Sequence, residues 1–237
     1  MVERAAEIGF FVLLVAGIPV MSWVTAHDPQ VGTLPRRALY FSAALSEWLF
    51  AALGLAAVRV AGFSAAGVGF RTVTFRTLMG WTLLLAFVTA AGLGLIVVLE
   101  RRGWWPQESE LVQLLMPRTR AEKVWALALL APTAALAEEF LYRGYLFAIL
   151  ARTLHSSLWA CALSSAAFGL AHFYQRPNGM VRAAVLGALL AWPLVRTGSL
   201  YPSMAAHFLI DAAAFGWLGP RMLKPGDGKS APNSESG

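Results

Sequence analysis

Two carboxylates and an arginine lie inside an apolar stretch near the middle of the chain. Glu138, Glu139 and Arg143 fall within six residues of one another, although a charge at the centre of a membrane helix costs roughly 2.5–3.5 kcal/mol. On a helix, Glu139 and Arg143 share a face and can form an ion pair that lowers the cost of burying both. Glu138 is turned about 100° away from Glu139. It is therefore predicted to be the unpaired carboxylate, free to take a proton from water and return it.

Two later apolar stretches each contain a histidine. Phe168 precedes His172 by four residues, and His207 precedes Asp211 by the same interval, so each pair shares a helical face. The Asp211 carboxylate can accept a hydrogen bond from His207 or hold a common ligand with it, and Phe168 can stack on the turn below His172. One membrane histidine alone is often only an interhelical hydrogen-bonding group. Ionisable residues on three successive apolar helices instead predict a functional site.

The composition indicates that a membrane surrounds these helices. Of the 237 residues, 14% are charged and 58% are hydrophobic, whereas soluble domains contain roughly 25% charged residues; the mean hydropathy is +0.61. We therefore expect an all-α, polytopic transmembrane helical bundle of about seven or eight spans. The net charge of +6 is scattered between apolar runs. This favours loops that face anionic lipid head groups over a surface that binds nucleic acid.

Apolar stretches of about 20 residues locate the expected spans. There are seven, at residues 8–26, 39–58, 78–99, 124–150, 157–173, 181–195 and 199–218. The first could be read as a secretory signal, but its apolar run is long for one, and a retained helix is favoured. Between the third and fourth spans, Leu111, Leu114 and Leu115 recur at helical spacing among polar residues. This pattern is typical of an amphipathic helix that lies on the membrane surface.

The spans and the motifs together suggest three regions. Residues 1–123 are expected to hold N-terminal transmembrane helices and the amphipathic interface helix, and residues 124–219 the catalytic helical core. Residues 220–237 are rich in Pro, Gly, Ser and charge, so we expect a disordered tail.

The motifs in residues 124–215 resemble those of the CPBP membrane proteins, a family that includes prenyl-protein CAAX endopeptidases and bacterial Abi-type bacteriocin-processing proteins. Each motif is short, but their order, spacing and location in successive apolar helices all agree with the family. The family motifs are Glu-Glu-x-x-x-Arg, then Phe-x-x-x-His, then His followed four residues later by Asn or Asp. The chain matches them at Glu138, Glu139, Arg143, Phe168, His172, His207 and Asp211.

The resemblance implies an intramembrane glutamic endopeptidase that uses no metal or other cofactor. Glu138 would activate water with the assistance of His172, while His207 and Asp211 would hold or polarise the scissile carbonyl. This agrees with the residue pattern, because an oxyanion needs donors aimed at it. An ionised Asp211 cannot donate, so it would have to be protonated or to orient His207 as the donor.

The remaining residues of the motifs would have supporting roles. Glu139, Arg143 and Phe168 are expected to hold the site together. Glu47, in the second span, is either a further partner of this polar cluster or a polar contact elsewhere in the bundle.

The implied substrate is a membrane-anchored protein or peptide, cleaved near a C-terminus that carries a lipid or a sorting signal. We expect an integral membrane protein of the bacterial inner membrane, with the lipid bilayer as its surroundings and no nucleic-acid partner. The sequence does not indicate an oligomeric state.

Two other functions fit the same residues. Two histidines and two carboxylates could bind zinc with an open position for water, although the sequence has no His-Glu-x-x-His. A non-catalytic membrane protein, such as an immunity factor, a chaperone or a transporter, could use the polar cluster for packing or proton relay.

Overall fold

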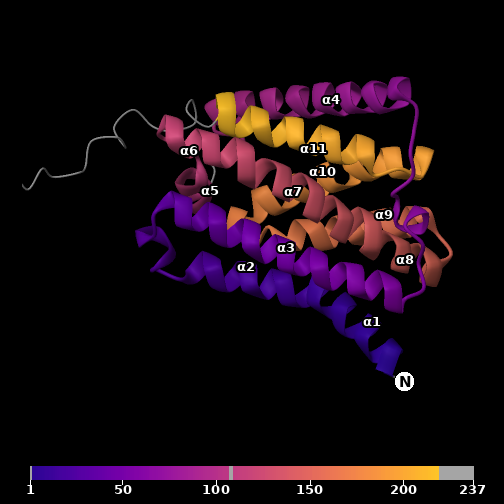
Figure 1. Ribbon diagram of the computed structural model, residues 1–237. Helices are drawn as coiled ribbons and strands as arrows, with labels where there is room; N and C mark the ends of the chain where they lie inside the picture. The colour runs from indigo at the N-terminus through magenta and orange to yellow at the C-terminus, as the bar shows by residue number, and fades with distance from the viewer. Residues whose placement is uncertain (1, 107–108, 219–237) are drawn as a thin grey trace, which may run out of the picture.

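Long apolar runs fold into helices throughout the described part of the chain. The computed structural model describes residues 2–106 and 109–218, and Figure 1 shows their helices side by side in one bundle. These residues contain no β-strand, which confirms the all-α expectation. Backbone groups are thus satisfied within each helix, as a bilayer requires. The tail expected at residues 220–237 lies outside the described residues.

The N-terminal half supplies three long helical rods. The first is α1 (Val2–Val12), which continues through the π-helical turn η1 (Leu13–Gly17) into α2 (Ile18–His27). The second is α3 (Arg36–Val60), and the third is α4 (Phe75–Arg101). The side chain of Thr74 caps α4 by accepting a hydrogen bond from the Thr77 N–H, so α4 begins where an N-cap residue stands.

The C-terminal half begins with a short helix and then one long, composite helix. The short helix is α5 (Glu110–Leu115). The long helix runs without a break through α6 (Arg120–Trp125), η4 (Ala126–Leu130), α7 (Ala131–Glu138), η5 (Glu139–Leu146) and α8 (Phe147–Leu154). It starts at a capping box formed by Thr119 and Glu122. The helix of the expected catalytic core therefore begins at Arg120, inside the region expected to lie on the membrane surface.

The chain then returns through three further helices. These are α9 (Ser157–Ala171), α10 (Arg176–Thr197) and α11 (Tyr201–Ala213), with the single-turn segments η6 (Phe173–Gln175) before α10 and η7 (Ala214–Leu218) after α11. In Figure 1, α11 lies next to α4 at one side of the bundle, and α1 and α2 form the opposite side.

Five of the described helices are long and apolar enough to cross a membrane. They are Arg4–His27, Arg36–Val60, Phe75–Arg101, Arg120–Leu154 and Phe173–Thr197. The expected number of seven or eight is therefore not confirmed. The helix α9 has 15 residues, or roughly 22 Å at 1.5 Å per residue, which is shorter than a hydrocarbon core of about 30 Å.

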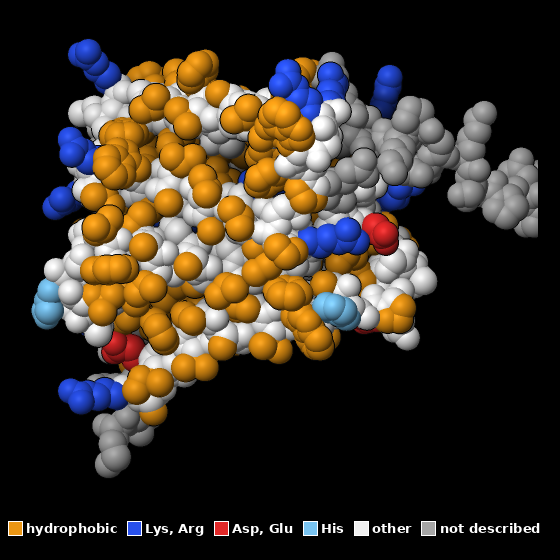
Figure 2. All heavy atoms as spheres, turned by 180° about the vertical axis from the view of Figure 1, so that it is seen from behind, with side chains coloured by type: hydrophobic (Ala, Val, Ile, Leu, Met, Phe, Trp, Pro, Cys, Tyr) orange, Lys and Arg blue, Asp and Glu red, His pale blue; other side chains and the backbone are white. Residues whose placement is uncertain are grey.

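The outer surface carries the apolar side chains that lipid would contact. Phe75, Phe87 and Leu158 are each more than 70% exposed, and Figure 2 shows orange side chains over the broad middle of one face, with the blue and red ones gathered toward its ends. The interior holds the charged pair instead, because Glu139 and Arg143 are 0% and 1% exposed. This inverted distribution is that of an integral membrane protein.

Candidate active site

The candidate site is centred on the junction between α7 and η5. Glu138 is the last residue of α7, and Glu139 and Arg143 belong to η5, which is a π-helical segment. Such segments are rare and occur frequently at functional sites. The predicted ion pair is present, with 3.1 Å between Arg143 Nη1 and Glu139 Oε1. The guanidinium also donates from Nε to the Gly187 carbonyl of α10, so the pair links two helices inside the bundle.

Glu139 also binds a histidine from a distant part of the sequence. His207, on α11, places its Nδ1 2.8 Å from Glu139 Oε1, and the His207 side chain is only 5% exposed. An ionised carboxylate can only accept a hydrogen bond, so Nδ1 is the donor when Glu139 is ionised. The other ring nitrogen, Nε2, is left to face the rest of the site. Glu139 therefore pairs with Arg143 and also fixes the orientation of the His207 ring.

Glu138 and Asp211 lie on either side of this outward ring nitrogen. Glu138 Oε2 is 3.8 Å and Asp211 Oδ2 is 3.7 Å from His207 Nε2. Both distances are longer than a hydrogen bond, so the predicted hydrogen bond between Asp211 and His207 is not formed in this structure. When the neutral ring carries its proton on Nδ1 and donates it to Glu139, Nε2 has no proton that Asp211 could accept. The Glu138 and Asp211 side chains remain 18% and 24% exposed, which leaves their oxygens accessible.

Glu138 accepts no hydrogen bond from the side chain of any described residue. Within the described residues, its only ion pair is the long one with His207, whereas Glu139 pairs with both Arg143 and His207. The two consecutive carboxylates therefore differ in environment. Glu139 is buried and paired with interior side chains, whereas Glu138 is partly exposed at the edge of the site.

Phe168 separates the two histidines and packs against both. Its ring centre is 4.5 Å from that of His172 and 6.5 Å from that of His207, and the Arg143 guanidinium lies 4.1 Å from the centre of the Phe168 ring. Phe168 and His172 are thus in contact as a tilted ring pair, with 60° between the ring planes, and the arginine adds a cation–π contact. His172 ends α9, and its Nδ1 lies 2.8 Å from the Phe168 carbonyl, so its Nε2 is the nitrogen left for another partner.

Glu47, which belongs to none of the motifs, also lies close to the site. Trp48 of α3 donates to Thr133 of α7, and the preceding residue, Glu47, lies within electrostatic reach of Glu138 and Asp211. The Glu47 Oε2 atom is buried and has no hydrogen-bond partner among the described residues. This favours the interpretation of Glu47 as a member of the polar cluster.

Tyr174 was missed by the sequence analysis. Its ring centre is 5.9 Å from that of His172, and its hydroxyl accepts a hydrogen bond from Gln175. It is also within electrostatic reach of Glu138 and Asp211. It lies on a three-residue turn, where no helical periodicity signals which side chain faces inward.

The site brings a water-accessible carboxylate to an oriented imidazole between packed helices. Within the described residues, no three His, Cys, Asp or Glu side chains form a group suited to a metal ion. The arrangement offers a proton acceptor, Glu138, next to Nε2 of His207. The position of this nitrogen is fixed because Glu139 binds the other nitrogen of the same ring.

Comparison with known proteins found a family model that matches the part of the chain that holds the candidate site. Residues 120–213 match the family model for the type II CAAX prenyl endopeptidases, described as Rce1-like. The search of curated proteins and the search of solved structures each found no match. The matched segment starts at the first residue of the long composite helix and contains every motif residue from Glu138 to Asp211. An Rce1-like type II CAAX prenyl endopeptidase domain is therefore found at residues 120–213, in agreement with the resemblance to the CPBP membrane proteins.

Proposed function

We propose that the protein hydrolyses a peptide bond of a membrane-associated protein and that Glu138 is the general base. The observation that carries the proposal is the contrast between neighbouring carboxylates. Glu139 is fully buried and pairs with Arg143 and His207, whereas Glu138 keeps accessible oxygens and faces His207 Nε2 at 3.8 Å. A general base needs an oxygen that water can reach and that no internal donor occupies.

In the proposed reaction, Glu138 accepts a proton from water while the water oxygen bonds to the scissile carbonyl carbon. The carbonyl π electrons move to its oxygen, and the oxyanion that forms accepts hydrogen bonds from Nε2 of a protonated His207 and from Asp211 in its protonated form. When this oxyanion collapses, the C–N bond breaks and Glu138 returns the proton to the leaving amine. His172 assists by holding the water. Phe168 and the Glu139–Arg143 pair keep the two rings in position.

The proposed substrate is a membrane-anchored protein or peptide, cleaved near a lipidated C-terminus or a sorting signal, and the proposed location is a bacterial inner membrane. Two observations support a substrate that enters from the bilayer. The site lies within packed helices whose outer surface is apolar, and the family model is that of a CAAX-type protease. The proposed chemistry uses only protein groups and needs no metal or other cofactor.

The test is turnover of a membrane-tethered fluorogenic peptide by the purified protein in proteoliposomes. We expect Glu138→Gln to lower kcat by about 10²–10⁴-fold, because the amide cannot accept the proton from water. Glu110→Gln, at an exposed position on α5, is the matched control and should retain full activity. Cleavage by the Glu138→Gln variant at the rate of the control would contradict the assignment.

The proposed absence of a metal has its own test. Incubation with 1,10-phenanthroline should leave turnover unchanged. A loss of turnover that added zinc restores would support a zinc-dependent protease instead. A protein that cleaves no tethered peptide, yet retains its fold, would support a non-catalytic membrane function.

A further inference from the structure

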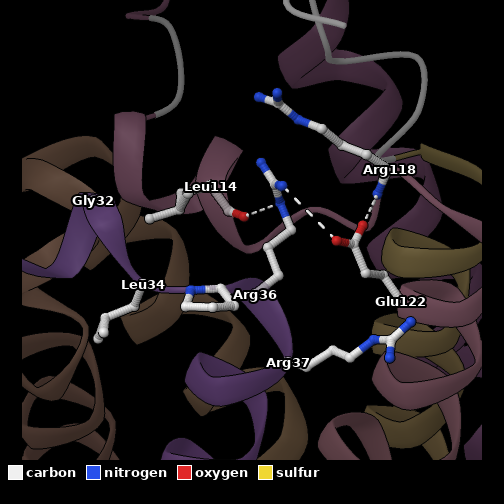
Figure 3. A pocket seen from close by; sticks show the side chains of 8 residues that line it. Gly32, Leu34, Arg36, Arg37, Leu114, Arg118 and Glu122 are labelled. Atoms are coloured by element: carbon white, nitrogen blue, oxygen red, sulfur yellow. Dashed lines mark hydrogen bonds and ion pairs between the residues drawn. The ribbon is translucent and has the colours of Figure 1, made fainter. Parts of the chain in front are cut away.

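A polar pocket lies away from the candidate active site, at one end of the bundle, where α3 and α6 begin and α5 ends. It has a volume of about 600 Å³, and its lining includes Arg36, Arg37, Arg118 and Glu122. Figure 3 shows Arg36 reaching between Leu114 and Glu122. The lining contains three arginines and one glutamate, a predominantly basic set that favours an anion over a cation.

Arg36 is held in place by the protein. Its Nε donates to the Leu114 carbonyl at 2.7 Å, and its Nη1 lies 3.9 Å from Glu122 Oε1. The side chain is only 16% exposed, so its guanidinium is partly desolvated and oriented before any ligand arrives. A guanidinium fixed in this way can offer its remaining N–H groups to phosphate oxygens at little cost in side-chain entropy.

Glu122 neutralises only part of the positive charge. Its Oε2 atom accepts hydrogen bonds from the backbone N–H groups of Arg118 and Thr119, at 2.8 and 3.0 Å, because it completes the capping box of α6. Arg37 is exposed and makes no ion pair with a described residue. The start of the 25-residue helix α3, at Arg36, adds the partial positive charge of its N-terminus.

The pocket lies at the level where the apolar surface of the bundle ends. Arg36 begins one candidate membrane span, and Arg120, close to Arg118 and Glu122, begins another. Within the next two turns, each of these helices exposes a large apolar side chain, Phe41 at 60% and Val124 at 63%. A basic pocket directly above an apolar surface is at the depth of phospholipid head groups.

We propose that this pocket binds the phosphate of an anionic phospholipid head group. The phosphate lies beside the guanidinium group of Arg36, within the positive field of Arg37 and Arg118, and the acyl chains extend along the apolar surface that includes Phe41 and Val124. A phospholipid fits better than a free phosphate ion, because only the lipid satisfies the charged pocket and the apolar surface together. The bound lipid links the starts of α3 and α6, which both lead to the polar cluster around Glu138.

The experiment measures lipid retention by the full-length protein in detergent, using native mass spectrometry with phosphatidylglycerol and phosphatidylcholine. We expect the wild-type protein to bind phosphatidylglycerol at least tenfold more tightly than phosphatidylcholine, and the double variant R37Q/R118Q to lose this preference. Arg76→Gln is the control, because Arg76 is exposed at the start of α4, at the opposite end of the bundle. Its preference should equal that of the wild type.

Thermal unfolding provides a second readout that does not depend on retention in the gas phase. Phosphatidylglycerol should raise the midpoint temperature of the wild type and of R76Q, and leave that of R37Q/R118Q unchanged. An equal rise in R37Q/R118Q would overturn the proposal, as would equal retention of the two lipids by the wild type. Displacement of phosphatidylglycerol by millimolar inorganic phosphate would identify a free-anion site, and displacement by a substrate peptide would identify a peptide site; either would overturn the lipid assignment.

Discussion

Glu139 Oε1 lies 2.8 Å from His207 Nδ1, although 68 residues separate the two in the chain. The contact joins the long composite helix to α11 and leaves His207 Nε2 facing Glu138 and Asp211. Because the same Glu139 oxygen lies 3.1 Å from Arg143, one carboxylate fixes both the cation and the imidazole. The second glutamate of the motif therefore positions the residues with which the first is proposed to work.

Replacing this positioning carboxylate should destabilise the protein. We expect Glu139→Gln to lower the free energy of unfolding by about 3–5 kcal/mol, because it leaves the charge of Arg143 buried without its partner. The measurement is the unfolding of the purified variant in detergent. Glu110→Gln, which removes an exposed carboxylate by the same substitution, is the control and should unfold like the wild type.

A double variant separates the lost ion pair from a general loss of packing. In E139Q/R143M the buried guanidinium is removed along with its partner, so most of the lost stability should return. If Glu139→Gln unfolded at the wild-type midpoint, the buried pair would have no structural role. If E139Q/R143M were no more stable than E139Q, the loss would come from packing and not from the unpaired charge.

Features that depend on local spacing were predictable from the sequence. The Glu139–Arg143 pair and the Phe168–His172 ring contact both join residues four apart, and an α-helix or a π-helical turn brings such residues together whatever surrounds it. The helical fold was predictable for a similar reason, since a bilayer leaves few alternatives to helices. The number of spans was not, because hydropathy alone does not show that α9 ends at 15 residues.

Features that depend on how the helices are rotated against one another were not predictable. Spacing suggested that Asp211 could accept a hydrogen bond from His207, yet the carboxylate within hydrogen-bond distance of the ring is Glu139, on another helix. No sequence pattern indicates which of several carboxylates a histidine on a different helix will face. The position of Glu47 was not predictable for the same reason. Its helix, α3, contacts α7 where Trp48 donates to Thr133, and this contact brings Glu47 near the polar cluster.

Asp211 offers a test of the proposed oxyanion role. Asp211→Asn keeps the shape and adds a donor, so kcat should stay within about tenfold of the wild type, whereas Asp211→Leu should lower it about 10²–10³-fold. The measurement is kcat and KM for the tethered peptide. The side chain is 24% exposed and 3.7 Å from His207, so both variants should fold. Full activity in D211L would remove Asp211 from the proposed mechanism.

The close approach of α9 to α10 gives the last prediction. A Cβ atom on Gly169 would lie 2.7 Å from the Met180 carbonyl oxygen and 2.8 Å from the Ala184 Cβ atom, both on the facing helix. Gly169→Ala must therefore push the helices apart, which we expect to cost about 1–3 kcal/mol of stability. Because Gly169 follows Phe168 and precedes His172 by three residues, the shift should also lower kcat.

Gly92→Ala is the matched control for this substitution. A Cβ atom on Gly92, in the middle of α4, would meet nothing within 4 Å, so its stability should equal that of the wild type or exceed it by up to about 1 kcal/mol. The two variants add the same methyl group to a helix and differ only in the space around it. Unfolding of G169A at the midpoint of G92A would show that α9 and α10 can separate freely, and the site would then not depend on their close packing.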